Sequence, residues 1–128
     1  MSTTTPENSN LQACQQGIAN WQKAFNQQDA KGCAQTYASD TVMQAKPFGT
    51  FTGREAIQVF WQQIMDQGFA EVDYQNTTWE QKDELSWILR SEWTMNKAYG
   101  VVHEEIWTVQ ADGTALLTSD EFEVLGER

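Results

Sequence analysis

The sequence is poor in basic residues, and this shortage excludes two classes of partner. Eight Lys and Arg residues stand against 18 Asp and Glu residues, so the net charge is −10. A nucleic-acid-binding surface needs clustered positive charge to meet the phosphates, and anionic membrane surfaces attract basic segments in the same way. The sequence also has no apolar run near the roughly 18 residues of a membrane span, and the first ten residues lack the pattern of a secretory signal. We therefore expect a cytoplasmic protein that binds neither nucleic acid nor membrane.

Cysteine and histidine are equally scarce, which argues against a metal centre. Cys14 and Cys33 are the two cysteines and have no metal-type spacing, and His103 is the one histidine. Both cysteines lie at apolar positions of predicted helices, which favours buried, reduced thiols, although a disulfide between the two helices stays open. A glycine-rich phosphate loop and a nucleophile elbow are also absent from the sequence. We expect no metal and no cofactor.

Aromatic residues, by contrast, are abundant. The chain of 128 residues contains six Trp, six Phe and three Tyr. Each aromatic side chain can bury about 150–250 Å², so these residues line either a large core or an apolar cavity. The length is that of one domain. We predict a flexible tail over residues 1–9 and a single domain over residues 10–128.

The first half of the domain has helical periodicity. Apolar residues recur every three and four positions between Leu11 and Phe25, as on an amphipathic helix. Asp29 is expected to cap a second, shorter helix with Tyr37 on its inner side. A short strand and a turn follow over residues 40–51.

A third helix is predicted after this turn. Thr52 and Glu55 have the spacing of a capping box, in which each side chain satisfies a backbone N–H of the other residue. Apolar residues from Ile57 to Ile64 then form one stripe, and Gly68 ends the helix.

The second half of the domain alternates with a period of two, which is typical of strands. Asp112 and Gly113 form a hairpin turn between the last two strands. Helices followed by a run of antiparallel strands indicate an α+β fold. The predicted strands begin near Val72 and cover residues 87–94, 101–108 and 116–124.

Several motifs together resemble one superfamily. They are Trp21 and Phe25, Asn26 to Asp29, Tyr37-Ala38-Ser39-Asp40, Lys46-Pro47-Phe48-Gly49 and Gly53-Arg54-Glu55-Ala56-Ile57. In this order, over about residues 10–125, the chain resembles the nuclear transport factor 2-like superfamily, nearest to its SnoaL-like and ketosteroid-isomerase-like branches. The resemblance implies a cone-shaped, cystatin-like barrel of three N-terminal helices on a strongly curved, mixed but mainly antiparallel sheet. It also implies a pocket at the open end and a homodimer formed through the convex face of the sheet.

The resemblance does not extend to the machinery of a ketosteroid isomerase. The oxyanion-hole tyrosine of that branch corresponds to Trp21, which has no phenol. The catalytic aspartate corresponds to Lys46 or Ala45, and neither is a carboxylate. One acid is retained, at Glu105. Because that reaction needs a base and a pair of donors, we reject this activity.

The alternation predicts a different set of chemical groups inside the cone. His103, Glu105 and Asp120 are expected to act as the catalytic residues, with His103 transferring protons near neutral pH and Asp120 orienting it. Glu105, surrounded by aromatics, is expected to have a raised pKa and to act as the acid. A register slip of one residue would instead turn Glu104 inward.

A ligand-binding pocket is predicted around these groups. Its expected residues are Trp21, Phe25, Tyr37, Lys46, Phe60, Trp87, Trp93, Trp107 and Phe122. Lys46 either binds an anionic substrate group or is a solvated turn residue. The sequence thus predicts binding of a small, largely apolar organic molecule, with cofactor-independent chemistry of the isomerase or lyase type. The alternative is a non-catalytic ligand-binding or protein-association module, with the histidine and the acids in structural roles.

Overall fold

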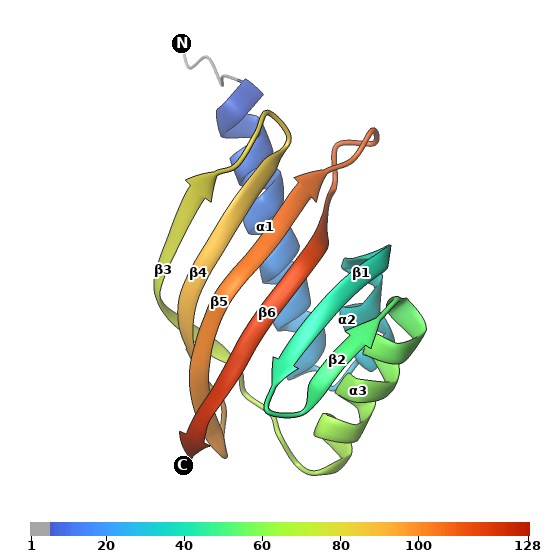
Figure 1. Cartoon of the computed structure of the whole chain (residues 1–128), viewed down its shortest axis with the longest axis vertical. Coiled ribbons are helices and arrows are strands. Elements are labelled where there is room, and N and C mark those ends of the chain that lie inside the picture. The colour runs from blue at the N-terminus through green and yellow to red at the C-terminus, as the bar shows by residue number, and fades with distance from the viewer. Residues whose placement is uncertain (1–5) are drawn as a thin grey trace.

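One six-stranded sheet organises the chain in the computed structural model, which describes residues 6–128 (Figure 1). The strands are β1 (Tyr37–Lys46), β2 (Gly49–Thr52), β3 (Asp73–Gln81), β4 (Ser86–Thr94), β5 (Ala98–Val109) and β6 (Ala115–Glu127). Their order is β2-β1-β6-β5-β4-β3, and β1 and β6 are parallel while the other neighbours are antiparallel. The predicted α+β class with a mixed sheet is confirmed. The sheet is not closed, because β2 and β3 are free edges, so the predicted barrel is wrong.

Three helices pack against this sheet. They are α1 (Pro6–Asn26), α2 (Ala30–Gln35) and α3 (Arg54–Asp66). The long helix α1 packs on one face of β4, β5 and β6, while α2 and α3 pack on each other beside β1 and β2 (Figure 1). Two helices precede the sheet, whereas α3 follows the β1–β2 hairpin. Within residues 6–128, no helix is both long and apolar enough to cross a membrane.

The helix ends test the capping predictions. The side chain of Asp29 caps α2 as predicted, because its Oδ1 accepts a hydrogen bond of 2.9 Å from the backbone N–H of Gly32. Gly68 follows the end of α3 with a φ of 92°, the left-handed conformation expected there. The predicted capping box of Thr52 and Glu55 is wrong. Thr52 still belongs to β2, and Gly53 is the N-cap residue without a side-chain hydrogen bond.

Two element boundaries also differ from the prediction. Helix α1 begins at Pro6, inside the segment predicted as a tail, and residues 1–5 lie outside the described residues. Strand β1 begins at Tyr37, which was predicted to lie on the second helix. The parallel pairing of Tyr37 with Leu117 on β6 explains this difference, because a partner 80 positions away leaves no local signal.

The core between the helices and the sheet is aromatic. Trp21, Phe25 and Trp61 pack in contact, with ring centroids 5.0–5.7 Å apart. Cys14 and Cys33 are free thiols that are fully buried in the same core, as the sequence favoured. Burial raises the pKa of Cys14 to about 11 and that of Cys33 to about 12, so both thiols stay protonated.

Candidate functional site

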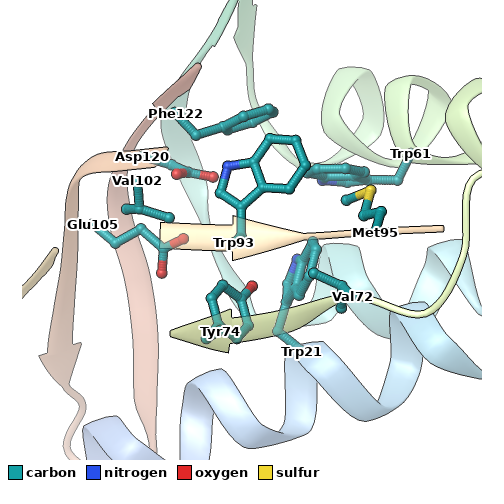
Figure 2. A pocket seen from close by; sticks show the side chains of 10 residues that line it. All are labelled: Trp21, Trp61, Val72, Tyr74, Trp93, Met95, Val102, Glu105, Asp120 and Phe122. Carbon is teal, nitrogen blue, oxygen red and sulfur yellow. The ribbon is translucent and has the colours of Figure 1, made fainter. Parts of the chain in front are cut away.

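A small chamber lies between α1, α3 and the inner face of the sheet (Figure 2). It is lined by Trp21, Trp61, Val72, Tyr74, Trp93, Met95, Val102, Glu105, Asp120 and Phe122. The space open to the centre of a water molecule is about 20 Å³, which is enough for one or two waters. We call this space the inner chamber. Most of its wall is aromatic or aliphatic, and its two acids are therefore its chemically distinctive feature.

Glu105 and Asp120 form a pair across two strands. They are direct partners in the β5–β6 register, and they are only 6% and 2% exposed. Directly opposed residues on antiparallel strands have their Cβ atoms about 4.5–5.5 Å apart, so the two carboxyl groups interact. Figure 2 shows both carboxyl groups on the same side of the chamber. The prediction that these two acids face the interior is confirmed.

Asp120 is held from behind by a short relay of hydrogen bonds. The indole N–H of Trp61 donates to the Tyr37 hydroxyl at 3.2 Å, and this hydroxyl donates to Oδ2 of Asp120 at 3.0 Å. Tyr37 is fully buried, and Arg54 Nε donates to its backbone carbonyl at 2.7 Å. The relay leaves Oδ1 of Asp120 buried and without a hydrogen-bond partner among residues 6–128. Asp120 therefore has one anchored oxygen and one unpaired oxygen.

Glu105 is held in a similar way by one tryptophan. The indole N–H of Trp107 donates to Oε1 of Glu105 at 3.0 Å, and Trp107 is fully buried. This indole lies against Gly17 of α1, where an added Cβ would come within 2.6 Å of the ring. Gly17 thus allows the close approach of helix and ring that positions Glu105.

Burial changes the protonation of both acids. It raises the pKa of Asp120 to about 7, while the hydrogen bond from Tyr37 lowers it in part. Burial and then the neighbouring Asp120 raise the pKa of Glu105 well above its ordinary value, and the Trp107 hydrogen bond opposes this rise. Near neutral pH the pair therefore keeps one proton, held mainly by Glu105, and two like charges are avoided. One acid and one base then stand side by side.

His103 does not belong to this site, so its predicted position is wrong. Its side chain lies on the outer face, where Nε2 is 2.8 Å from Oε1 of Glu123 and about two-fifths of the imidazole side chain is exposed. A β-bulge causes the difference. Between Val102 and Glu105, β5 has one residue more than either β4 or β6, so these two residues both point inward although they are three apart. Counting by twos from Glu105 therefore assigns His103 to the wrong face.

The other predicted ligand-binding residues divide into three groups. Trp21, Trp93 and Phe122 line the inner chamber, and Phe60 lines the groove described below. Tyr37, Trp107 and Phe25 are buried behind the lining; the first two hold the acids, and Phe25 stacks on Trp21. Lys46 and Trp87 line neither space. Lys46 instead pairs with Glu121 at 2.7 Å on the outer face, which agrees with its alternative interpretation as a solvated residue.

Five lining residues were not predicted from the sequence: Trp61, Val72, Tyr74, Met95 and Val102. Trp61 and Tyr74 matter most, because both carry a polar group. Trp61 lay on the predicted inner stripe of the third helix, so its periodicity was a usable signal. Tyr74 comes from the edge strand β3, and burial followed by the charges of Glu105 and Asp120 raises its pKa well above the ordinary value. Its phenol therefore stays a hydrogen-bond donor.

A second, larger cavity adjoins the inner chamber. It has a volume of about 230 Å³ and shares Trp61, Trp93, Met95 and Phe122 with the chamber. We call this cavity the outer groove, and we call the four shared residues the partition. The rest of the groove is mainly apolar, and the polar side chains that line it are Gln67 and Glu127. Phe48, which is half exposed, lies where the groove meets solvent.

The chain belongs to the SnoaL-like domain family, which matches residues 18–119. Within residues 6–128, no group of three or more His, Cys, Asp or Glu side chains is arranged to hold a metal ion. Among curated proteins, none matches this sequence.

Solved structures with the same fold are numerous but distant in sequence. A ketosteroid isomerase-like protein from Erwinia carotovora atroseptica is 14% identical, with a TM-score of 0.79 over 93% of this chain and 98% of that one. A hexachlorocyclohexane dehydrochlorinase is 11% identical, with a TM-score of 0.80 over 96% and 90%. ActVI-ORFA from Streptomyces coelicolor is 15% identical, with a TM-score of 0.74 over 90% and 97%. These likenesses establish the fold and no more.

Proposed function

We propose that this protein binds a small, largely apolar organic molecule and moves protons on it without a cofactor. Asp120 is the base and Glu105 is the acid. The observation that carries the proposal is the buried Oδ1 of Asp120, which has no hydrogen-bond partner among residues 6–128 and belongs to a residue that lines the inner chamber. A buried polar atom without a partner costs free energy, and a substrate C–H or O–H group would occupy this position usefully.

The protons balance in a simple cycle. The Asp120 carboxylate takes a proton from a carbon of the substrate, and Glu105 gives its proton to another atom of the same molecule. If that atom is a carbon, the product is an isomer. If it is a leaving group, the bond to this group breaks, and a double bond and the protonated leaving group are formed. A proton passing from Asp120 to Glu105 then restores the starting state.

The protonation of the pair supports these roles. A base works best when its pKa lies near the working pH, and burial brings the pKa of Asp120 to about 7. Glu105 has its pKa raised further by burial and by Asp120, so it keeps the proton that an acid must supply. The similar structures include a ketosteroid isomerase-like protein and a dehydrochlorinase. Proton-transfer chemistry of either type is compatible with the Glu105–Asp120 pair.

Deuterium exchange tests the proposal with a defined probe. β-Tetralone is a bicyclic ketone with acidic C–H groups, and its incorporation of deuterium in deuterium oxide can be followed by NMR. We expect the wild-type protein to accelerate exchange, and Asp120→Asn to lower this acceleration by about a hundredfold to ten-thousandfold. His103→Gln is the matched control, because it removes the titratable group that lies outside the chamber. Equal exchange by the wild type and Asp120→Asn would contradict the proposal.

A non-catalytic ligand-binding or protein-association module is the second candidate. It is favoured by the volume of the inner chamber, about 20 Å³, which holds no ligand of ordinary size unless side chains move. In the exchange experiment, this function predicts that β-tetralone binds while its deuterium exchange stays at the rate of the protein-free solution. The two candidates therefore give different results in one experiment.

The proposal keeps two expectations from the sequence, a cytoplasmic location and a homodimer through the convex face of the sheet. The face turned away from the helices carries the Lys46–Glu121 ion pair, the His103–Glu123 hydrogen bond and the exposed Val42. Light scattering coupled to size-exclusion chromatography measures the mass of the protein particle in solution. A mass of twice 14.6 kDa is expected, and Val42→Glu should then lower it toward that of one chain.

A further inference from the structure

Two indole N–H groups of the inner chamber have no acceptor. Nε1 of Trp21 and Nε1 of Trp93 are buried and have no hydrogen-bond partner among residues 6–128, although both residues line the chamber. The other tryptophan of the lining, Trp61, uses its N–H on Tyr37, and Trp107 behind the wall uses its N–H on Glu105. Buried indole N–H groups usually find a partner. Trp87 is a third exception among residues 6–128, but only Trp21 and Trp93 line the chamber, where a ligand would supply an acceptor.

The chamber that holds the two unpaired donors also holds an unpaired acceptor. Trp21 comes from α1 and Trp93 from β4, and Figure 2 shows the indole nitrogen of Trp93 on the side of the ring nearest the Asp120 carboxyl group. Oδ1 of that carboxyl group also lacks a partner. Two donors and one proton acceptor in a single cavity match a ligand that offers an acceptor oxygen beside an acidic C–H group.

The partition connects this polar end to the outer groove. Two spaces of about 20 and 230 Å³ meet at the partition, whose four residues line both. The groove can take an apolar body larger than the chamber can hold. Glu127 at the groove and the acid pair in the chamber all disfavour an anionic ligand.

We propose that the ligand is an uncharged molecule whose acceptor oxygen receives hydrogen bonds from the indole N–H groups of Trp21 and Trp93, while its apolar body lies in the outer groove. This inference rests on the proposed function for the place of the ligand but not for any reaction. It assigns Trp21 and Trp93 as ligand-binding residues that determine specificity. During proton removal by Asp120, the same two donors would stabilise the negative charge that develops on the oxygen.

The test compares two probes of nearly the same shape. β-Tetralone carries one carbonyl oxygen, and tetralin lacks it. We expect the N–H signals of Trp21 and Trp93 in two-dimensional NMR spectra to move downfield with β-tetralone and much less with tetralin. Trp87 is the matched control, since its indole N–H is also buried and unpaired but the residue lines neither cavity. Its signal should stay in place with both probes.

Affinity ratios give a second readout that separates hydrogen bonding from packing. Calorimetry should find β-tetralone bound about tenfold more tightly than tetralin. Trp21→Phe and Trp93→Phe should each lower this ratio by about threefold or more, whereas Trp87→Phe should leave it within about a factor of two. Addition of a carboxylate to tetralin should weaken binding.

The possible results distinguish this inference from the proposed function. If exchange requires Asp120 but all three Trp→Phe variants keep the same affinity ratio, the inference is wrong and the proposed function stands. If the Trp21 and Trp93 signals respond to β-tetralone without any deuterium exchange, the inference stands and the acid–base function is wrong. If neither β-tetralone nor tetralin binds, both proposals are contradicted.

Discussion

The inner chamber and the outer groove share four residues but differ in size and chemistry. The chamber measures about 20 Å³ and contains Glu105 and Asp120, whereas the groove measures about 230 Å³ and has a mainly apolar wall. Polar groups of the chamber are anchored by Tyr37, Trp61 and Trp107. In the proposed function, the groove would supply affinity for an apolar body, and the acids of the chamber would transfer protons.

The two regions also differ in where their residues lie in the fold. The acids come from adjacent positions on β5 and β6, near the middle of the sheet, and are buried on all sides. The groove uses the ends of the elements, with Phe48 from the β1–β2 turn and Phe69 from the segment after α3. A buried centre fixes the geometry of the acids, and in the proposed function a peripheral groove would accept ligands of different shape. Variants that affect one region alone can therefore separate affinity from chemistry.

The largest expected effect is on the pH dependence of stability, and it concerns the chamber alone. Because the pKa of Asp120 rises to about 7 on folding, the folded protein holds a proton that the unfolded chain loses above about pH 4. The tighter binding of this proton by the folded state adds to the free energy of unfolding. This addition is complete below about pH 4 and is lost as the pH rises through about 7. Asp120→Asn should thus gain stability relative to the wild type by on the order of a few kcal/mol between about pH 5 and about pH 8.

Urea denaturation at about pH 5 and about pH 8 measures the free energy of unfolding and checks this prediction. Asp40→Asn serves as a control, because Asp40 is exposed and outside the chamber. A constant difference in unfolding free energy between Asp120→Asn and the wild type at the two pH values would mean that Asp120 titrates normally.

A smaller effect is expected at the partition. A Cβ on Gly100 would lie 2.5 Å and 2.7 Å from two ring atoms of Trp93, and would also collide with the backbone carbonyl oxygen of Glu123. Gly100→Ala should therefore displace the Trp93 indole and destabilise the protein by about 1–3 kcal/mol. Chemical denaturation measures the loss, and the shift of the Trp93 indole N–H signal reports the displacement. If this signal does not move in Gly100→Ala, the contact with Gly100 does not hold the partition.

A change confined to the groove should alter affinity without altering chemistry. Phe48 is 50% exposed and its ring centroid is 5.6 Å from that of Phe60. Phe48→Ala removes part of the apolar wall and should weaken the binding of β-tetralone by about threefold to tenfold. The exchange rate at saturating β-tetralone should stay unchanged. Val59→Ala is the matched control, because Val59 is 53% exposed but lines a different surface.

The smallest effect is expected for the histidine that the sequence placed in the site. His103 and Glu123 form an exposed side-chain contact, and exposed pairs of this kind contribute only about 0–1 kcal/mol. His103→Gln should change the unfolding free energy by less than about 0.5 kcal/mol and leave the exchange rate within about a factor of two. If His103→Gln lost as much exchange as Asp120→Asn, His103 would take part in the proton transfer. The proposal that this chemistry is confined to the chamber would then be wrong.

Much of the fold was predictable because its signals are local. The spacing between Leu11 and Phe25 predicted α1, the side chain of Asp29 predicted the start of α2, and Asp112-Gly113 predicted the last hairpin. The resemblance to the superfamily was confirmed by the match over residues 18–119. Two predictions failed because strand pairing overrides local signals. Tyr37 was predicted on the second helix but begins β1, which pairs with β6. Thr52 was predicted to cap the third helix but belongs to β2, which pairs with β1.

The site followed the same rule. The acids Glu105 and Asp120 were predicted to face inward from strand alternation, and they do. His103 was misplaced because a bulge in β5 is decided by the pairing with both neighbouring strands and leaves no mark in the alternation. Tyr74 was missed because the role of an edge-strand phenol depends on what α1 and β5 bring to its side of the sheet.

The sequence by itself determined which kinds of residue were available: many tryptophans, two acids on neighbouring strands, and few basic residues. Only the tertiary structure decided which groups meet, because the bulge in β5 and the long-range pairing of β1 set the direction of each side chain. It turned His103 and Lys46 outward, placed Tyr37 behind Asp120, and left the indole N–H groups of Trp21 and Trp93 unpaired in the chamber. Local periodicity can assign a residue to a face, but contacts between distant segments decide whether its polar group finds a partner.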